Sequence, residues 1–96
     1  MEFADRATRD LYNGVVSKPA LKVVPAVLRQ RALDKLTLLD AAVSLDQLKI
    51  PPGNRLETLR GDRAGQHFIR IDDQFRICFQ WTDSGPINVE IVDYHN

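Results

Sequence analysis

The sequence lacks most of the features that would place it outside the cytoplasm. Its 96 residues include one cysteine, Cys78, which leaves no internal disulfide, and no apolar run approaches the ~18 residues that cross a bilayer. The first five residues, MEFAD, have neither the basic nor the apolar region of a secretion signal. These absences predict one cytoplasmic domain over residues 1–96, near the lower size limit for independent folding.

An excess of charge is also missing, since 13 Lys and Arg balance 13 Asp and Glu. Binders of membranes or of nucleic acids in general usually carry a positive excess, so neither class is favoured and no membrane partner is expected. The distribution is uneven, however. Between residues 55 and 76 there is no lysine but there are 5 arginines, namely Arg55, Arg60, Arg63, Arg70 and Arg76. Arginine's rigid fork suits bidentate phosphate binding. The alternative is a solvated mixed-charge surface, because acidic residues are interspersed among them.

Motifs for metal ligation and nucleophilic catalysis are absent. His67 and His95 have no cysteine or carboxylate pattern at ligand spacing, so no metal is expected. There is no glycine-rich phosphate loop and no nucleophile elbow, and no cofactor is expected. Cys78 has no activating neighbour in the sequence, which favours a small buried side chain over a nucleophile.

The first half of the chain has helical patterning. A helix is predicted from Ala4 or Asp5 to about Asn13, with Gly14 as its stop, followed by a connector over 15–24. Apolar residues then recur at helical spacing from Pro25 to about Val43, with one more turn at 45–48. The N-terminal end of this second helix, near Val27, is predicted to be partly exposed to solvent. The two helices are expected to pack as a hairpin on a sheet.

The second half has strand patterning. After the break at 50–54, short segments at 55–60, 67–72, 75–82 and 87–94 are separated by turn residues. They predict an antiparallel meander, and the whole chain is therefore predicted to be an α+β domain with a helical hairpin on a small twisted antiparallel sheet.

Alternation within these strands predicts their register. If the apolar residues of 67–72 and 75–82 face one core, Ile71 pairs with Phe75 and Ile69 with Ile77. Arg70 then lies directly opposite Arg76 on the other face, where like charges ~5 Å apart destabilise a sheet unless an anion lies between them.

The same alternation of apolar and polar residues predicts the register of the last strand. It pairs Ile77 with Ile91, Phe79 with Val89 and Trp81 with Ile87. The arginine face would then also carry Cys78, Glu90, Val92 and Tyr94.

This face is compatible with metal-free cleavage of RNA. The ribose 2′-hydroxyl attacks its own neighbouring phosphate, so the protein need not provide a nucleophile. Clustered arginines can stabilise the growing negative charge, and a histidine such as His95 can move protons near neutral pH. The alternative for His95 is a polar residue at the end of the chain.

Three segments resemble HigB-type toxins of the RelE superfamily of toxin–antitoxin systems. Residues 55–66, RLETLRGDRAGQ, are similar to the family's R-L-E-x-L-K/R-G-D-R-x-G-Q stretch. The match continues through 69–79, IRIDDQFRICF, and closes with VEIVDYH at 89–95, like the family's final D-Y-H. The resemblance implies an endoribonuclease that cuts messenger RNA on the translating 70S ribosome. It also implies a HigA-type helix-turn-helix antitoxin as partner, with operator DNA contacted only through that antitoxin.

The resemblance also implies roles for individual residues. Arg60 occupies the position of a catalytic or phosphate-binding residue that is often lysine, and its role would be electrostatic because arginine stays protonated. Arg70 and Arg76 match phosphate-binding arginines, and His95 matches a terminal catalytic histidine that moves a proton. Glu57 stands where some relatives have histidine and is a second candidate for proton transfer. Arg63, in the same arginine-rich segment, is a candidate RNA ligand.

Two other functions remain open. One is a toxin of the same fold that inhibits a protein such as gyrase without cleaving RNA. The other is a non-enzymatic interaction module, whose arginines contact acidic partner residues and whose mark would be an exposed apolar patch.

Overall fold

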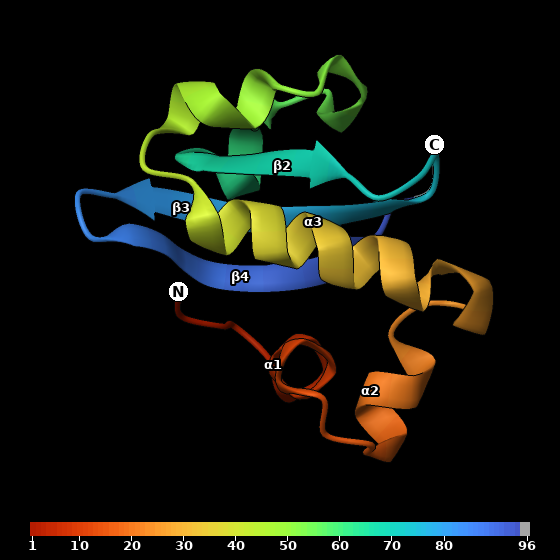
Figure 1. Cartoon of the computed structure of the whole chain (residues 1–96). Coiled ribbons are helices and arrows are strands. Elements are labelled where there is room, and N and C mark those ends of the chain that lie inside the picture. The colour runs from red at the N-terminus through yellow and green to blue at the C-terminus, as the bar shows by residue number, and fades with distance from the viewer. Residues whose placement is uncertain (95–96) are drawn as a thin grey trace.

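Helix α3 (Arg29–Ala41) lies across one face of an antiparallel sheet with the strand order β1-β2-β3-β4 (Figure 1). The computed structural model describes residues 1–94. The four strands are β1 (Glu57–Thr58), β2 (Gln66–Arg70), β3 (Phe75–Thr82) and β4 (Gly85–Asp93). This arrangement confirms the predicted α+β fold and its antiparallel meander. None of the helices in residues 1–94 is long and apolar enough to cross a membrane.

Helix α1 (Arg6–Asn13) begins and ends where the sequence predicts. The Asp5 side chain accepts a hydrogen bond from the Thr8 backbone N–H at 2.8 Å, which satisfies one free donor of the first turn. Gly14 ends the helix at φ 74°, a left-handed conformation that costs glycine little.

The prediction of a connector over 15–24 is wrong, because this segment contains helix α2 (Lys18–Lys22). The Ser17 hydroxyl accepts a hydrogen bond from the Ala20 N–H at 3.2 Å and caps the helix. Pro19 lies in the first turn, where its missing N–H has no helical partner to lose. Ser17 and Pro19 therefore start a helix here, although the pattern had indicated a break.

The long second helix is divided in two. A 3₁₀ turn, η1 (Ala26–Leu28), leads into α3, and Ala42 then leaves the helix in an extended conformation. Ala32, Leu36 and Leu39 of α3 are fully buried against the sheet core. Val27 is 86% exposed, as predicted for this end of the helix. Figure 1 shows α1 beside the β4 edge and α2 beyond it, so the connection from α1 to α3 contains α2 and η1.

Two 3₁₀ turns, η2 (Leu45–Lys49) and η3 (Pro52–Asn54), connect α3 to the sheet. Buried Asn54 holds them together, because its side-chain N–H₂ donates to the carbonyls of Leu48 at 3.2 Å and Ile50 at 3.3 Å. The first predicted strand, 55–60, is shortened to Glu57–Thr58, since Arg55 is left-handed at φ 46°. A further 3₁₀ turn, η4 (Gly61–Arg63), precedes β2.

The predicted register is confirmed at the centre of the sheet and wrong towards the start of β4, where it pairs with the end of β3. Ile69 pairs with Ile77, Ile77 with Ile91, and Arg70 lies opposite Arg76. Beyond Cys78 the pairing shifts, and Gln80 faces Ile87 while Trp81 faces Pro86. Two residues of β4, Asn88 and Val89, here occupy the space opposite one residue of β3. Asn88 adopts φ 52°, and such a bulge is invisible to strict alternation.

The N-terminal residues complete the sheet at its β4 edge. Phe3 forms a parallel bridge with Val89, and the Thr8 hydroxyl of α1 accepts a hydrogen bond from the Ile91 N–H at 3.0 Å. Thr8 is fully buried. Helix α1 is thus bonded to the backbone of the strand whose other side pairs with β3.

Candidate functional site

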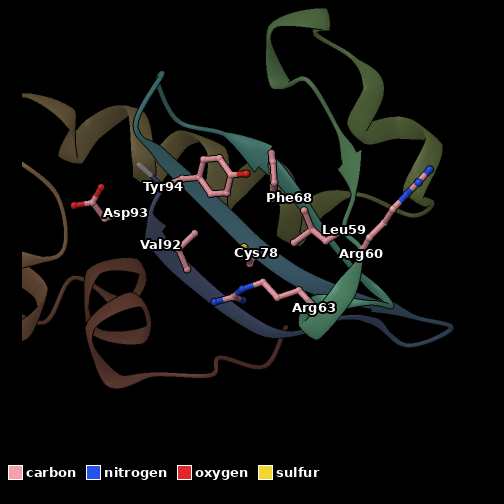
Figure 2. Close-up of a pocket in the computed structure, with 8 residues that line it drawn as sticks. All are labelled: Leu59, Arg60, Arg63, Phe68, Cys78, Val92, Asp93 and Tyr94. Atoms are coloured by element: carbon pink, nitrogen blue, oxygen red, sulfur yellow. The ribbon is translucent and has the colours of Figure 1, made fainter. Parts of the chain in front are cut away.

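A pocket of about 400 Å³ lies on the sheet face opposite α3 (Figure 2). Strand alternation puts the side chains of Phe68, Cys78 and Val92 on this face, because their neighbours Ile69, Ile77 and Ile91 fill the core. The segment around η4 and the end of β4 form the walls. The lining consists of Leu59, Arg60, Arg63, Phe68, Cys78, Val92, Asp93 and Tyr94.

Arg63 has the most defined position of the basic residues in this pocket. Its Nη1 donates to Glu90 Oε1 at 2.9 Å and to Gln66 Oε1 at 3.0 Å. The hydrogen bond that Arg63 donates to Glu90 raises the pKa of Arg63 above its usual value. In Figure 2 the guanidinium of Arg63 extends below Cys78 towards Val92, along the floor of the pocket. Arg63 therefore presents a fixed cation inside the pocket.

Arg60 lies at the rim. It precedes η4 as its N-terminal flanking residue, and its side chain is exposed and directed away from Cys78 in Figure 2. Here it can meet a ligand that extends beyond the pocket.

Arg76 lies beneath the aromatic end of the same face. It is 5% exposed, and its Nη1 donates to the backbone carbonyls of Asp72 and of Phe75. Its Cζ is 5.7 Å from the ring centroids of both Phe68 and Tyr94, and these rings are 5.6 Å apart. Cation–π attraction of this kind is strengthened by burial. Arg76 therefore supports the two rings that wall the pocket.

Arg70 is separated from this group although it lies directly opposite Arg76. Its Nη1 is 3.0 Å from Asp73 Oδ1, and its side chain lines a second pocket beside α3. The repulsion expected between the two arginines is thus relieved by Asp73 and by backbone carbonyls, so the fold does not require an external anion between them. The structure brings Arg60 and Arg63 to one pocket with Arg76 behind its aromatic wall, and it places Arg70 at another.

Of the two proton-transfer candidates, Glu57 is not among the described residues that line the pocket. Glu57 is exposed on β1, where it pairs with Phe68. His95 lies outside the described residues. Its neighbours Asp93 and Tyr94 line the pocket, and the Tyr94 N–H donates to the Gln74 carbonyl at 2.7 Å.

Three residues of the site had no role assigned from the sequence. Alternation placed Glu90 and Tyr94 on the arginine face, but their contacts with Arg63 and Arg76 join segments distant in the chain. Phe68 could have been found by the same signal, since it stands two positions before Arg70 in one strand.

Neither Cys78 nor His67 is in the environment of a reactive side chain. Cys78 is 2% exposed, and burial raises the pKa of its thiol, which keeps it protonated. His67 Nδ1 is 3.0 Å from Thr58 Oγ1 and its ring contacts Phe79 on the core side, where burial lowers its pKa. Within residues 1–94, no three His, Cys, Asp or Glu side chains are grouped to hold a metal ion.

Comparison with known proteins identifies the family of this chain. A family model described as the RelE-like toxin of the type II toxin–antitoxin system HigB matches residues 1–95. The chain is also 35% identical over 88 residues to Toxin HigB-1 of Vibrio cholerae serotype O1, an alignment that covers 92% of this chain and 90% of that protein.

Proposed function

Since the chain belongs to the HigB-like toxins of type II toxin–antitoxin systems, we propose that it is an endoribonuclease that cleaves messenger RNA on the 70S ribosome. Family membership establishes a RelE-like toxin with an antitoxin as partner. What we propose beyond this is the cleavage reaction, its messenger RNA substrate and its dependence on the ribosome.

The observation that carries this proposal is the combination of cations and aromatic rings in one pocket. Arg63 presents a fixed guanidinium, and Phe68 and Tyr94 form an aromatic wall. Single-stranded RNA is commonly held in this way, with phosphates on cations and unstacked bases on aromatic faces.

The proposed reaction is attack of a ribose 2′-hydroxyl on the adjacent phosphorus. The bond from phosphorus to the 5′-oxygen breaks, which leaves a 2′,3′-cyclic phosphate and a free 5′-hydroxyl. One group removes the 2′-hydroxyl proton and another donates a proton to the departing 5′-oxygen. Arg63, assisted by Arg60 at the rim, stabilises the negative charge that grows on the phosphate oxygens. Arg76 acts as a positioning residue that holds Phe68 and Tyr94.

His95 and Glu57 are the proposed proton-transfer groups. A histidine titrates near neutral pH and suits either step. His95 directly follows Tyr94 in the sequence, and Tyr94 lines the pocket whereas Glu57 does not, which supports His95 over Glu57.

The proposed partner in the cell is a HigA-type helix-turn-helix antitoxin that keeps the toxin inactive. Contact with operator DNA is proposed to occur only through that antitoxin, because the balanced net charge of this chain does not favour DNA binding.

The test is controlled expression in a bacterial host with mapping of messenger RNA 5′ ends. Ribosome-framed cuts are expected with the wild type and should disappear with His95→Ala and with Arg76→Ala. Arg9→Ala, which removes an exposed arginine from α1, serves as the control that keeps cleaving. Growth arrest with intact messages would overturn the nuclease proposal and favour a protein target.

A further inference from the structure

A second basic pocket lies at the C-terminal end of β2, beside α3 and the turn between β2 and β3. It measures about 340 Å³ and is lined by Arg31, Lys35, Gly53, Arg70, Ile71, Asp72 and Asp73. Arg31 and Lys35 are four residues apart on α3 and therefore project from the same side of the helix. Three cations from two separate elements thus converge on one hollow.

Arg70 has an unused donor here. Its Nε is buried and has no hydrogen-bond partner among residues 1–94, and its Nη1 is paired with Asp73 at 3.0 Å. A buried donor without a partner is unfavourable, which makes this guanidinium receptive to an acceptor. Asp73 is 96% exposed, so its ion pair is screened by water and easily replaced.

Lys35 is held in position by a hydrogen bond to Asn54. Its ammonium group donates to Asn54 Oδ1 at 2.5 Å, and Asn54 is itself fixed by its bonds to two backbone carbonyls. An ammonium group has three donors, so two remain for a ligand. Asn54 therefore sets the position of Lys35 and leaves it able to bind.

The two carboxylates in the lining differ in availability. Asp72 Oδ1 accepts hydrogen bonds from the backbone N–H groups of Gln74 and Phe75, at 2.9 and 2.7 Å, and thereby holds the turn. Asp73 makes the contact with Arg70 from an exposed position. When Asp73 turns away, Arg31, Lys35 and Arg70 face one structural carboxylate, and the pocket is positive.

We propose that Arg31, Lys35 and Arg70 form a second RNA-phosphate site, in which Asp73 occupies Arg70 until the RNA backbone displaces it. The inference rests on the proposed function and deepens it. Arg70 is the cross-strand neighbour of Arg76, whose aromatic partners wall the first pocket, so neighbouring residues of β2 and β3 connect the two sites. The phosphate belongs either to the messenger RNA or to ribosomal RNA, which present the same chemistry.

The first arm of the test measures binding of a fluorescent single-stranded RNA to the purified toxin. The RNA carries 2′-O-methyl groups, which prevent cleavage by 2′-hydroxyl attack. Arg31→Ala is expected to weaken binding by about 3- to 10-fold and to reduce the slope of log K against log salt by about 0.7, the value for one phosphate contact on a single strand. Asp73→Asn is expected to strengthen binding. Lys18→Ala, which removes one exposed lysine of α2, is the charge-matched control and should have no effect.

The second arm repeats these variants in co-sedimentation with ribosomes that lack messenger RNA. A loss confined to this arm assigns the site to ribosomal RNA, and a loss with the oligonucleotide assigns it to the messenger strand. Unchanged binding of Arg31→Ala and Asp73→Asn in both arms overturns the second site. Circular dichroism of each variant checks the fold, and Arg31→Ala and Asp73→Asn alter exposed side chains that the core does not need.

Failure of this inference is distinguishable from failure of the proposed function. A wild type that cuts messages while both variants bind normally would remove the second site and leave the nuclease. A wild type that binds RNA through Arg31 without cutting it would remove the nuclease proposal and leave the second site.

Discussion

Arg70 and Arg76 are directly opposed on β2 and β3, yet their guanidinium groups turn to different partners. Arg76 bonds to the carbonyls of its own turn and contacts Phe68 and Tyr94, whereas Arg70 pairs with Asp73. Like charges across a strand pair cost free energy unless each is compensated. The compensation here is internal, and it divides the arginine face into a pocket with an aromatic wall and a pocket beside α3.

Replacement of Arg76 by lysine should separate the effect of its positive charge from the effect of its planar guanidinium group. An ammonium group keeps the positive charge but lacks the planar guanidinium that spans the carbonyls and both rings. We expect cleavage to fall by about 100-fold, because displaced rings would misplace the RNA, and stability to fall by about 1–3 kcal/mol. Single-turnover cleavage and urea unfolding measure the two effects. Full activity in the lysine variant would contradict the positioning role.

The ion pair between Arg63 and Glu90 should control RNA affinity. Glu90→Gln keeps a hydrogen-bond acceptor for Arg63 but removes the negative charge beside it, so we expect tighter binding of an uncleavable RNA. Arg63→Ala should weaken binding by about 10-fold, which corresponds to ~1.4 kcal/mol. Fluorescence anisotropy measures both variants. Equal affinities for the two variants would argue that Arg63 does not contact RNA.

The bond from Ile91 to Thr8 should contribute to stability because it attaches α1 to the sheet. Thr8→Val preserves the shape of the side chain but leaves the buried Ile91 N–H without its acceptor. We expect a loss of about 1–3 kcal/mol in the free energy of unfolding. Thr8→Ser keeps the hydroxyl and is the matched control, with a smaller loss. Equal losses in the two variants would assign the effect to packing.

Acid should weaken the junction between α1 and α2. The pKa of Asp10 is lowered from 3.8, chiefly by its hydrogen bond from the Ser17 hydroxyl and then by Arg6. The unfolded chain therefore takes up a proton first as the pH falls. The stability that this carboxylate contributes is complete above its unfolded pKa and is lost as the pH falls through the lowered folded value.

Urea unfolding between about pH 5 and pH 2 measures this contribution. The wild type should lose more stability over this range than Asp10→Asn, which cannot titrate at this position. Parallel curves for the two proteins would show that Asp10 does not contribute to the acid sensitivity.

Local chemistry explains which elements the sequence could predict. The cap residues of α1 lie within three residues of the helix, and alternation in β2 and β3 is short and regular, so these bounds and the Arg70–Arg76 pairing follow from neighbours in the chain. Helix α2 was missed because Pro19 and Ser17 serve equally in a turn and at a helix start. The bulge at Asn88 was missed because it breaks the alternation on which the register depends.

By itself, the sequence determined the family, the order of the strands and the face on which the arginines stand, because motifs and side-chain periodicity are properties of adjacent residues. Only the tertiary structure decided what those arginines touch. Glu90 reaches Arg63 across 27 positions, and Lys35 reaches Asn54 across 19. Such contacts depend on how α3, the turns and the strands pack together, and periodicity within a single element carries no information about them.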